Sequence, residues 1–538
     1  MELTREQKLA VEAPEDEVVC IAGAGAGKTR VLTQRANWLI DQGAAPSSLF
    51  IATFTRKAAA EMAQRLQKRN LFVGTFHSLA LQILTTHAPL VGYDPNELTV
   101  VNDKDAEALC CDIMEDLGYD KQATEKEIKT YLELYYTGRP PKKGKKKILS
   151  RIANEYWVRL RSQNTVDYGL IQTLCLKLLQ MPKVIAGYHD QIEHVLVDEF
   201  QDIDAVQYDI VKCLSPPATF FAVGDPRQSI YSFRGARPDL VSAGTNGKVY
   251  HLTKCYRCGS DIVDAANSLI SCNKSHDTTP LIDNGDYSNV ERVEGGYWDV
   301  VSEIKRLTSS GYALDDIAVL SRTWWAIDKL QSHLEGEGID SFIAGQKTEE
   351  SFVFTQVYAA LRLSVNPKDE IAARILRWSL GIGDTWDHAK EIAASQGKRI
   401  LDVCDGEFAE GLRSGRPLTM LAKHFPQNQE EIGYWLNLPG ATIQDKILWH
   451  ATKETENITT PPNHITLSTI HAAKGLEWPC VIMLDVNERQ LPHSRARTKE
   501  DIEEERRVAY VAVTRAQECL VVHSYKEPSS FIDEMNLT

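Results

Sequence analysis

A run of small residues stands directly before a lysine and a threonine near the start of the chain. The apolar residues 18–21 before it predict a strand, and the residues after Thr29 predict a helix. In such a loop, small residues let backbone N–H groups surround phosphates, while Lys28 reaches the β- and γ-phosphates and Thr29 offers its hydroxyl to Mg²⁺. Only Ala22, in place of the first glycine, departs from the strict pattern. The predicted nucleoside triphosphate site is Ala22, Gly23, Ala24, Gly25, Ala26, Gly27, Lys28 and Thr29.

Two adjacent carboxylates, Asp198 and Glu199, follow the apolar residues 194–197. Hydrolysis of a triphosphate needs two acidic functions side by side, one to hold Mg²⁺ and one to orient and deprotonate the attacking water. We expect Asp198 to take the first role and Glu199 the second, with ATP as the nucleotide.

Two arginines, Arg257 and Arg515, are candidates for stabilising the charge on the γ-phosphate. An arginine in that position raises the rate of phosphoryl transfer by about 10³- to 10⁵-fold. Both lie in the second of two α/β regions, so ATP is expected between two domains.

Two α/β regions must position these side chains. Short β-branched runs alternate with helical patterns over 17–85 and return at 194–224, which predicts a parallel sheet. A second such region begins near Val249, and the periodicity within each region is interrupted by a helical stretch. We expect an α/β fold with parallel sheets in two domains: a first domain of 1–89 and 191–248 with a helical insertion of 90–190, and a second domain of 249–364 and 456–538 with a reduced helical insertion of 365–455.

Composition limits the class of protein. The 538 residues exceed what one core of about 250 to 300 residues holds. The net charge of −14 does not exclude a nucleic acid, because binding needs only a local basic groove. The 11 cysteines form no disulfide framework, and Cys255 and Cys258 are expected as packed thiols rather than metal ligands. With no signal peptide and no membrane-spanning segment, we expect a cytoplasmic protein. The lysine run at 142–147 fits a solvated loop or a phosphate contact.

Nine segments follow the order of the motifs of superfamily 1 helicases, and from Leu3 to about Phe531 the chain resembles the UvrD/Rep/PcrA group. They are LTREQ, AGAGAGKTRVL, TFTRKAAAEM, GTFHSLAL, VLVDEFQD, VGDPRQSIYSFRGA, CYRC, ITLSTIHAAKGLEW and EEERRVAYVAVTRA. The resemblance implies two RecA-like motor domains that close on ATP and Mg²⁺ and move along single-stranded DNA, 3' to 5', with unwinding at single/double-strand junctions.

For the nucleotide, the resemblance assigns five further residues. It implies that Gln7 reads adenine and that Arg30 and Tyr256 sandwich its ring. It also implies that Gly475 and Glu477 contact the triphosphate and the ribose.

For DNA, the resemblance implies contacts that tolerate any sequence, because aromatic rings stack on any base. The residues are Phe54, His77, Tyr231, Phe233, Arg234, Arg322 and His471. The alternative for Phe54 and Tyr231 is a place in the core. Gln228, implied to sense the γ-phosphate, precedes Tyr231 by three residues, so one rigid segment would link both sites. Pro226 and Arg227 stand where relatives often carry acidic residues and have no explanation in the sequence.

Several departures weaken the expectation of unwinding. The second insertion is only about 90 residues, although 380–384 resembles the family's duplex-contacting Gly-Ile-Gly turn. After Arg515 the chain lacks the longer hairpin that separates strands in relatives. Separating a duplex costs about 1.4 kcal/mol per base-pair step, so translocation is better supported than unwinding. Trp324 stands where relatives tend to have asparagine.

Three other functions fit parts of the pattern. One is the motor subunit of a helicase–nuclease complex, with little unwinding of its own. Another is a P-loop kinase or switch ATPase indifferent to nucleic acid, which stimulation of ATPase by single-stranded DNA would distinguish. The third is a catalytically silent DNA-binding scaffold, which the set of candidate catalytic residues disfavours.

Overall fold

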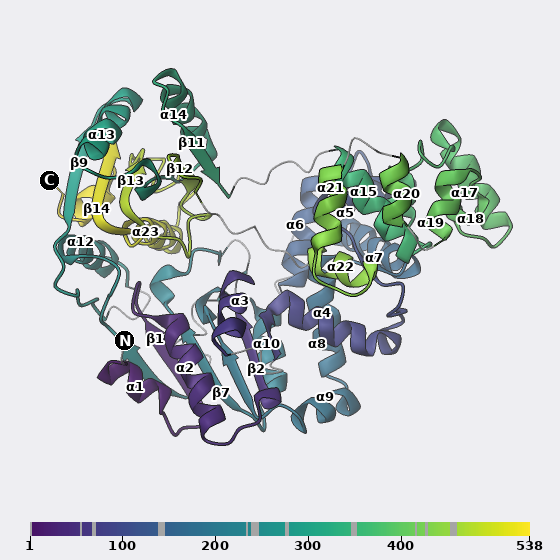
Figure 1. The fold of residues 1–538 in the computed structure, drawn as a ribbon, viewed down its shortest axis with the longest axis horizontal. Helices are drawn as coiled ribbons and strands as arrows, with labels where there is room; N and C mark the ends of the chain where they lie inside the picture. Colours follow the sequence, from purple (N-terminus) through teal and green to yellow (C-terminus); the bar gives the residue numbers. More distant parts are fainter. Residues whose placement is uncertain are drawn as a thin grey trace.

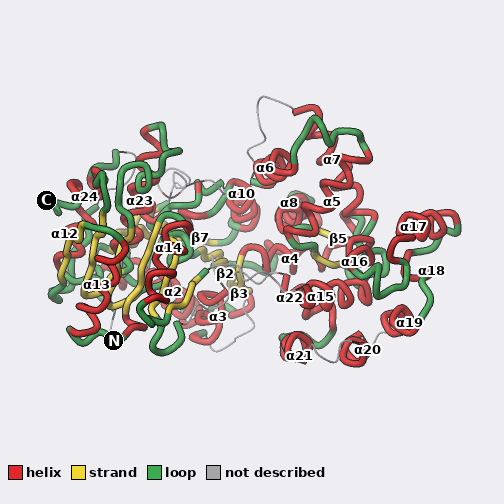
Figure 2. The backbone as a smooth tube through the Cα atoms, turned by 90° about the horizontal axis from the view of Figure 1, so that it is seen from above, coloured by secondary structure: helices red, strands yellow, loops and turns green. Residues whose placement is uncertain are grey.

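The computed structural model describes most of the chain. The described residues are 3–53, 56–66, 72–137, 146–232, 235–237, 241, 247–274, 279–345, 352–414, 417–424, 429–451 and 460–537. Figure 1 shows two α/β units, one in the lower centre and one at the upper left, beside a block of helices on the right. Viewed from above in Figure 2, α17 (Trp386–Ser395), α18 (Ile400–Val403) and α19 (Glu407–Arg413) lie at the end of the block farthest from the strands.

The first sheet has six parallel strands in the order β3-β2-β6-β7-β1-β8. Side chains alternate between its two faces: Val19 and Ile21 face one core cluster, and Val18 and Cys20 face another. Both faces are therefore covered, as parallel sheets require. The strands are β1 (Glu17–Ala22), β2 (Leu49–Thr53), β3 (Phe72–Thr75), β6 (His194–Val197), β7 (Thr219–Gly224) and β8 (Lys248–Leu252), and the helices are α1 (Arg5–Val11), α2 (Lys28–Asp41), α3 (Arg56–Arg65), α4 (Phe76–His87) and α10 (Ala205–Leu214).

The second sheet also has six parallel strands, in the order β11-β12-β10-β13-β14-β9. Its residues alternate in the same way, with Ala318 and Leu320 in one core cluster and Ile317 and Val319 in the other. The strands are β9 (Asn289–Glu294), β10 (Ile317–Ser321), β11 (Ser341–Ala344), β12 (Ile465–Thr469), β13 (Trp478–Leu484) and β14 (Ala516–Ser524), and the helices are α12 (Ser260–Ser271), α13 (Tyr297–Ser309), α14 (Trp324–Gly336), α23 (Lys499–Val513) and α24 (Ser530–Glu534).

Helices dominate both stretches between the sheet segments. In its described residues, the first stretch adds a two-stranded parallel sheet, β4 (Thr99–Val100) with β5 (Thr165–Val166), and its core is continuous with one face of the first sheet. Its helices are α5 (Asp103–Asp116), α6 (Glu125–Tyr136), α7 (Lys146–Ser162), α8 (Tyr168–Leu179) and α9 (Pro182–His189). Besides α17 to α19, the second stretch has α15 (Phe352–Val365), α16 (Glu370–Ile375), α20 (Pro417–His424), α21 (Gln429–Asn437) and α22 (Ile443–Ala451).

Two of the expected boundaries are displaced. Val249, the expected start of the second domain, pairs with Val19 inside the first sheet, because β8 is the edge strand beside β1. Helix α15 was expected within the second domain, but its buried residues share a core with the second helical stretch. Hydrophobic patterns identify a strand or helix without identifying its packing partner. We propose that the first motor domain extends to Leu252 and that the second insertion begins at Phe352.

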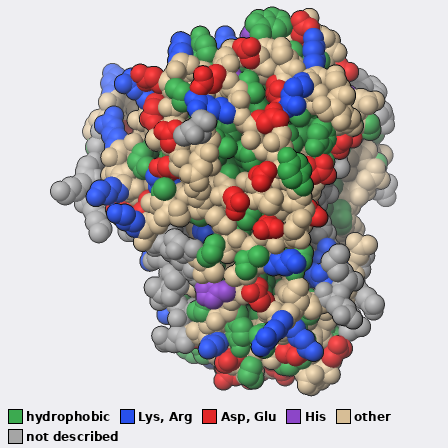
Figure 3. Space-filling model, turned by 90° about the vertical axis from the view of Figure 1, so that its left-hand side faces the viewer, with side chains coloured by type: hydrophobic (Ala, Val, Ile, Leu, Met, Phe, Trp, Pro, Cys, Tyr) green, Lys and Arg blue, Asp and Glu red, His purple; other side chains and the backbone are tan. Residues whose placement is uncertain are grey.

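On the face drawn in Figure 3, Lys and Arg side chains are interspersed with Asp and Glu side chains. Among the described residues, every helix is too short or too polar to cross a membrane.

Candidate nucleotide and nucleic-acid sites

The loop from Gly23 to Gly27 leaves the carboxyl end of β1 and leads into α2. Gly25 and Gly27 adopt φ angles of +67° and +85°, which side chains disfavour. A Cβ at Gly25 would also lie 2.7 Å from Cβ of Arg257 and 2.9 Å from Sγ of Cys255. The backbone of Tyr256 donates to the Gly25 carbonyl at 3.0 Å. The phosphate loop is therefore packed directly against the segment that carries Tyr256 and Arg257.

Parallel strands place the two acidic residues beside this loop. Asp198 is 2% exposed and accepts a 3.4 Å hydrogen bond from the Thr29 hydroxyl. Burial and then the Glu199 carboxylate raise the pKa of Asp198 to about 7. Burial opposes ionisation of Glu199 as well, but Lys28 and then Lys474 overcome it and lower the pKa of that residue.

The oxygens of Thr29 and Asp198 suit a Mg²⁺ ion, which binds through one or two protein oxygens together with phosphates and water. Within the described ranges, no group of three or more His, Cys, Asp or Glu side chains forms a metal cage. Cys255 and Cys258 are buried free thiols, and the Cys258 amide donates to Sγ of Cys255 at 3.4 Å.

Gln228 is held at both ends of its amide. Its Nε2 donates to Oδ2 of Asp225 at 2.7 Å, and Nη2 of Arg515 donates to its Oε1 at 3.2 Å. Arg515 is 1% exposed and also donates to the carbonyls of Val511 and Leu476. Burial and the nearby charge of Arg257 lower the pKa of Arg515 to about 9. The structure thus joins the predicted γ-phosphate sensor of the first sheet to a predicted arginine finger of the second.

Arg257 also lies at the junction of the two α/β units. Its Nε donates to Oε2 of Glu477 at 2.5 Å, and its Nη1 donates to the Thr514 carbonyl at 3.1 Å. Glu477, expected at the ribose, is therefore the ion-pair partner of a predicted arginine finger. Gly475, two residues earlier, is exposed with a φ of +87°.

The predicted adenine residues each lie next to the same loop. Gln7 is 2% exposed, and its Nε2 donates to the Ala26 carbonyl at 3.1 Å. Its Oε1 accepts from the Thr4 amide, which caps α1. Arg30 is half-buried on the first turn of α2, and Tyr256 is 39% exposed.

Lys474 is a site residue that sequence reasoning missed. It donates to the Asp202 carboxylate and, at 2.7 Å, to the Gln228 carbonyl. Its ammonium also lies 4.9 Å from the centroid of the Tyr231 ring. The signal in the sequence that could have found Lys474 was its position between His471 and Gly475 within one motif. Its contacts with Asp202, Gln228 and Tyr231 become visible only in the tertiary structure.

The predicted nucleic-acid residues that the structure describes occupy two places. His77 and Tyr231 line a cavity of about 600 Å³ between the carboxyl edge of the first sheet and α5, α6 and α8. The Tyr231 hydroxyl donates to the His471 carbonyl at 3.1 Å. Arg322 is held by three hydrogen bonds of 2.8, 3.0 and 3.2 Å to Glu505. Phe54, Phe233, Arg234 and the lysines at 142–145 lie outside the described residues.

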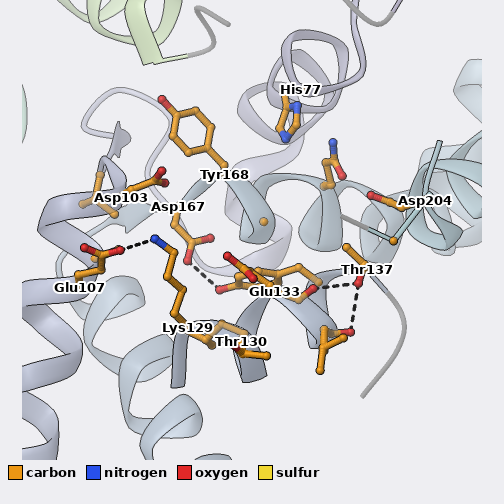
Figure 4. Close-up of a pocket in the computed structure, with 18 of the residues that line it drawn as sticks. His77, Asp103, Glu107, Lys129, Thr130, Glu133, Thr137, Asp167, Tyr168 and Asp204 are labelled. Carbon is orange, nitrogen blue, oxygen red and sulfur yellow. Dashed lines mark hydrogen bonds and ion pairs between the residues drawn. The ribbon is translucent and has the colours of Figure 1, made fainter. Parts of the chain in front are cut away.

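Figure 4 shows the wall that the first helical stretch adds to this cavity. Tyr168, which the sequence reasoning did not single out, meets the His77 ring edge to face at 6.1 Å between centroids. Lys129, on the same wall, is paired with Glu107. Asp167 accepts hydrogen bonds from the hydroxyls of Tyr136 and Tyr156, both of which line the cavity with it.

The Gly-Ile-Gly turn and Trp324, two positions considered for DNA contact, both make contacts within the protein. In the Gly-Ile-Gly turn, the amides of Ile382 and Gly383 both donate to the Arg377 carbonyl at 3.0 Å, so these two are already used within the turn. Trp324 packs against a core cluster of the second sheet, which accounts for an aromatic residue at that position.

A phosphate loop, paired carboxylates and arginines from the second α/β unit together define a two-domain P-loop ATPase. Residues 3–246 match the model of the UvrD/REP helicase N-terminal domain, and residues 250–444 and 441–527 match that of the UvrD-like helicase C-terminal domain. The chain therefore belongs to the UvrD/Rep family of helicases, which are ATP-hydrolysing enzymes.

The chain is also similar to two staphylococcal proteins named ATP-dependent DNA helicase PcrA. It is 27% identical over 613 residues to that of Staphylococcus aureus, covering 97% of this chain and 83% of the relative. It is 26% identical over 606 residues to that of Staphylococcus epidermidis, with the same coverage.

Proposed function

We propose that this protein is an ATP-dependent DNA helicase that moves along single-stranded DNA, 3' to 5', and unwinds duplex at junctions. The observation that carries the proposal is the path of residues 225–231. Gln228 in this segment contacts Arg515, and Tyr231 contacts the backbone of His471. One continuous segment of the first motor domain thus contacts the second beside both the phosphate loop and the cavity.

We assign ATP hydrolysis to the residues grouped at the phosphate loop. Lys28 binds the β- and γ-phosphates, and Glu199 orients and deprotonates water. The lowered pKa of Glu199 keeps its carboxylate ionised, which both roles require. Thr29 and Asp198 fit Mg²⁺, and a bound Mg²⁺ supplies charge neutralisation at the phosphate oxygens.

Arg257 and Arg515 stabilise the charge that develops on the γ-phosphate, and both belong to the second motor domain. Arg257 must exchange its Glu477 partner for phosphate, and Arg515 must turn from the Gln228 amide. Hydrolysis would thereby depend on closure of the two domains, because neither domain alone carries the full set of charges.

We infer that the adenosine end of ATP lies between Gln7, Arg30 and Tyr256, with Gly475 and Glu477 at the ribose and phosphates. The tie between Gln7 and the phosphate loop supports this placement. An exposed tyrosine with its backbone fixed to Gly25 offers a ring face for the base.

The cavity beside His77 and Tyr231 suits bases better than phosphates. Its wall carries Asp103, Glu125 and Glu133, whose negative charge repels a phosphate backbone. The rings of His77, Tyr168 and Tyr231 offer faces for stacking, a contact that accepts any base. The phosphate contacts are proposed at Arg322 and His471, with Phe54, Phe233 and Arg234 completing the set.

An alternative is a single-stranded DNA translocase or the motor subunit of a helicase–nuclease complex, with little unwinding of its own. The internally bonded Gly-Ile-Gly turn favours this alternative, because two of its amides are not offered to a duplex phosphate. A forked duplex distinguishes the two functions: ATP-dependent separation only on forks with a 3' tail supports helicase activity and its direction, whereas ATPase without separation supports the alternative.

The test of the core proposal is ATPase activity with and without single-stranded DNA. Single-stranded DNA is expected to stimulate the wild-type enzyme, and Lys28→Ala is expected to abolish hydrolysis while single-strand affinity stays within about threefold. Lys183→Ala, on α9, is a matched control for loss of one lysine. An ATPase indifferent to DNA and RNA would refute the proposal and favour a switch ATPase.

A further inference from the structure

Arg227 is one of two residues of the 225–231 segment, with Pro226, that the sequence left without a role. It lies on the short 3₁₀ turn Pro226–Gln228 that follows β7, and it is 4% exposed. A buried guanidinium is unfavourable unless it is paired and hydrogen-bonded. Its contacts therefore indicate what the position does.

Toward the first motor domain, Arg227 pairs with Asp225. Its Nε donates to Oδ1 of Asp225 at 2.8 Å, and Oδ2 of the same carboxylate accepts from Nε2 of Gln228 at 2.7 Å. The Asp225 side chain is fully buried, and its backbone amide is fixed by Oε1 of Gln201 at 2.8 Å. One buried carboxylate thus holds both Arg227 and the proposed γ-phosphate sensor.

Toward the second motor domain, Arg227 reaches two separate segments. Its Nη1 donates to the Thr279 carbonyl at 2.6 Å, and its guanidinium carbon lies 5.9 Å from the centroid of the Tyr510 ring on α23. Leu281, just after Thr279, is bound to Asn267 of α12 by two hydrogen bonds of 2.8 and 2.9 Å.

The phosphate loop completes the surroundings of Arg227. A Cβ built on Gly23 would lie 2.9 Å from Nη2 of Arg227 and 2.1 Å from Cδ2 of Leu281. The guanidinium therefore lies where the phosphate loop, the sensor segment and the second motor domain meet.

We propose that Arg227 is a positioning residue for ATP hydrolysis: it keeps Asp225 paired so that Gln228 can turn to the γ-phosphate, and it ties that event to the second motor domain. This inference rests on the proposed role of Gln228. Without the Arg227 guanidinium, Gln228 would be the remaining side-chain donor to this buried carboxylate among the described residues. Its turn toward the phosphate would then leave the charge with the backbone amide of residue 227, 3.1 Å from Oδ1 of Asp225, and no charged partner in hydrogen-bond contact. The hydrogen bond from the same guanidinium to the Thr279 carbonyl couples the position of the sensor segment to the second motor domain.

The charges around Asp225 agree with this role. Among the described residues, the groups that face its carboxylate are Arg227 on its own segment, Lys28 at the start of α2 and Tyr510 on α23. Burial alone would raise the pKa of Asp225, but Arg227 and then Lys28 lower it. Asp225 is consequently ionised at neutral pH while Arg227 is present.

The test compares steady-state ATPase, with saturating single-stranded DNA, in variants of Arg227. Arg227→Gln should lower kcat about 10- to 100-fold, the range expected for losing a hydrogen bond to a charged group, with KM for ATP within about threefold of wild type. At saturating Mg²⁺, its kcat relative to wild type at the same pH should recover as the pH falls from 8 to 6, because a buried Asp225 without its guanidinium partner takes up a proton. Arg227→Lys should show no such recovery, since its ammonium keeps Asp225 paired.

A double variant and a matched control separate positioning from mere stability. Asp225→Asn with Arg227→Gln removes both charges and should regain at least about tenfold in kcat over Arg227→Gln alone. Arg506→Gln breaks another buried arginine pair, to Glu534, away from the sensor, and its kcat should stay within about twofold of wild type.

Three results would overturn the inference: an Arg227→Gln kcat within twofold of wild type, no gain in the double variant, or equal losses in Arg227→Gln and Arg506→Gln. If thermal unfolding shows that Arg227→Gln does not fold, Arg227→Lys and the double variant carry the test. Failure of the proposed function is distinct, because DNA would then fail to stimulate the wild-type enzyme itself.

Discussion

Replacing Arg362 with methionine tests whether one buried ion network holds the two helical insertions together. Arg362, on α15, has a fully buried side chain and donates two 2.9 Å hydrogen bonds to Asp369. Its Nη1 also pairs with Asp105 on α5, in the other insertion. Asp369 in turn caps α16 by accepting from the Ala372 amide at 2.9 Å.

The expected loss follows from the number of groups left unpaired. Removing one partner of a buried ion pair costs about 3–5 kcal/mol, and here two carboxylates lose the same partner. Burial, partly offset by Arg362, raises the pKa of Asp105 above its usual value, so this carboxyl can protonate when the arginine is gone. The penalty is therefore largest above neutral pH and shrinks as the pH falls, and about 3–5 kcal/mol is the expectation at pH 8.

Arg374→Met is the matched control, because Arg374 pairs with Asp112 across the same two insertions but has a side chain that is 45% exposed. An exposed pair of this kind contributes about 0–1 kcal/mol. Hydrogen exchange should show weakened protection in both α5 and α16 of Arg362→Met, with α2 of the first motor domain unchanged. A loss below about 1 kcal/mol, or one equal to that of Arg374→Met, would refute the reasoning.

Three further outcomes are expected at the proposed sites. Lowering the pH from 8 to 6 should raise the Mg²⁺ concentration for half-maximal ATPase about tenfold, because protons compete for Asp198, whose pKa is about 7; an unchanged requirement would contradict this. Tyr231→Ala should weaken single-strand affinity by about 1–3 kcal/mol in fluorescence anisotropy at fixed salt, whereas Tyr231→Phe should keep it; equal losses would point to the hydroxyl. Gly25→Ala should abolish stabilisation by ATP in thermal unfolding, since the φ of +67° and the contact with Arg257 leave no room for a Cβ; normal stabilisation would argue against the loop geometry.

The local parts of the site were predictable because their chemistry is contiguous. A strand, a small-residue loop and a helix bearing Lys28 occupy adjacent residues, and Asp198 with Glu199 ends one strand. Parallel pairing then brings separate strand ends to one edge of a sheet, so motifs far apart in the sequence meet without further information. The membership of β8 in the first sheet was not predictable, because a short edge strand of mixed polarity, KVYHL, carries no signal for the sheet that it joins.

The sequence by itself determined the P-loop chemistry, the parallel α/β class and the helicase family, since each is written in short ordered motifs. The tertiary structure decided which charges are buried and what they pair with. Arg227 meets Thr279, Arg362 meets Asp105, and Lys474 meets Asp202, each across more than 50 residues of chain. The physical reason is that a buried charge is tolerable only with its partner, and the partner is chosen by the packing of whole domains rather than by neighbours in the chain.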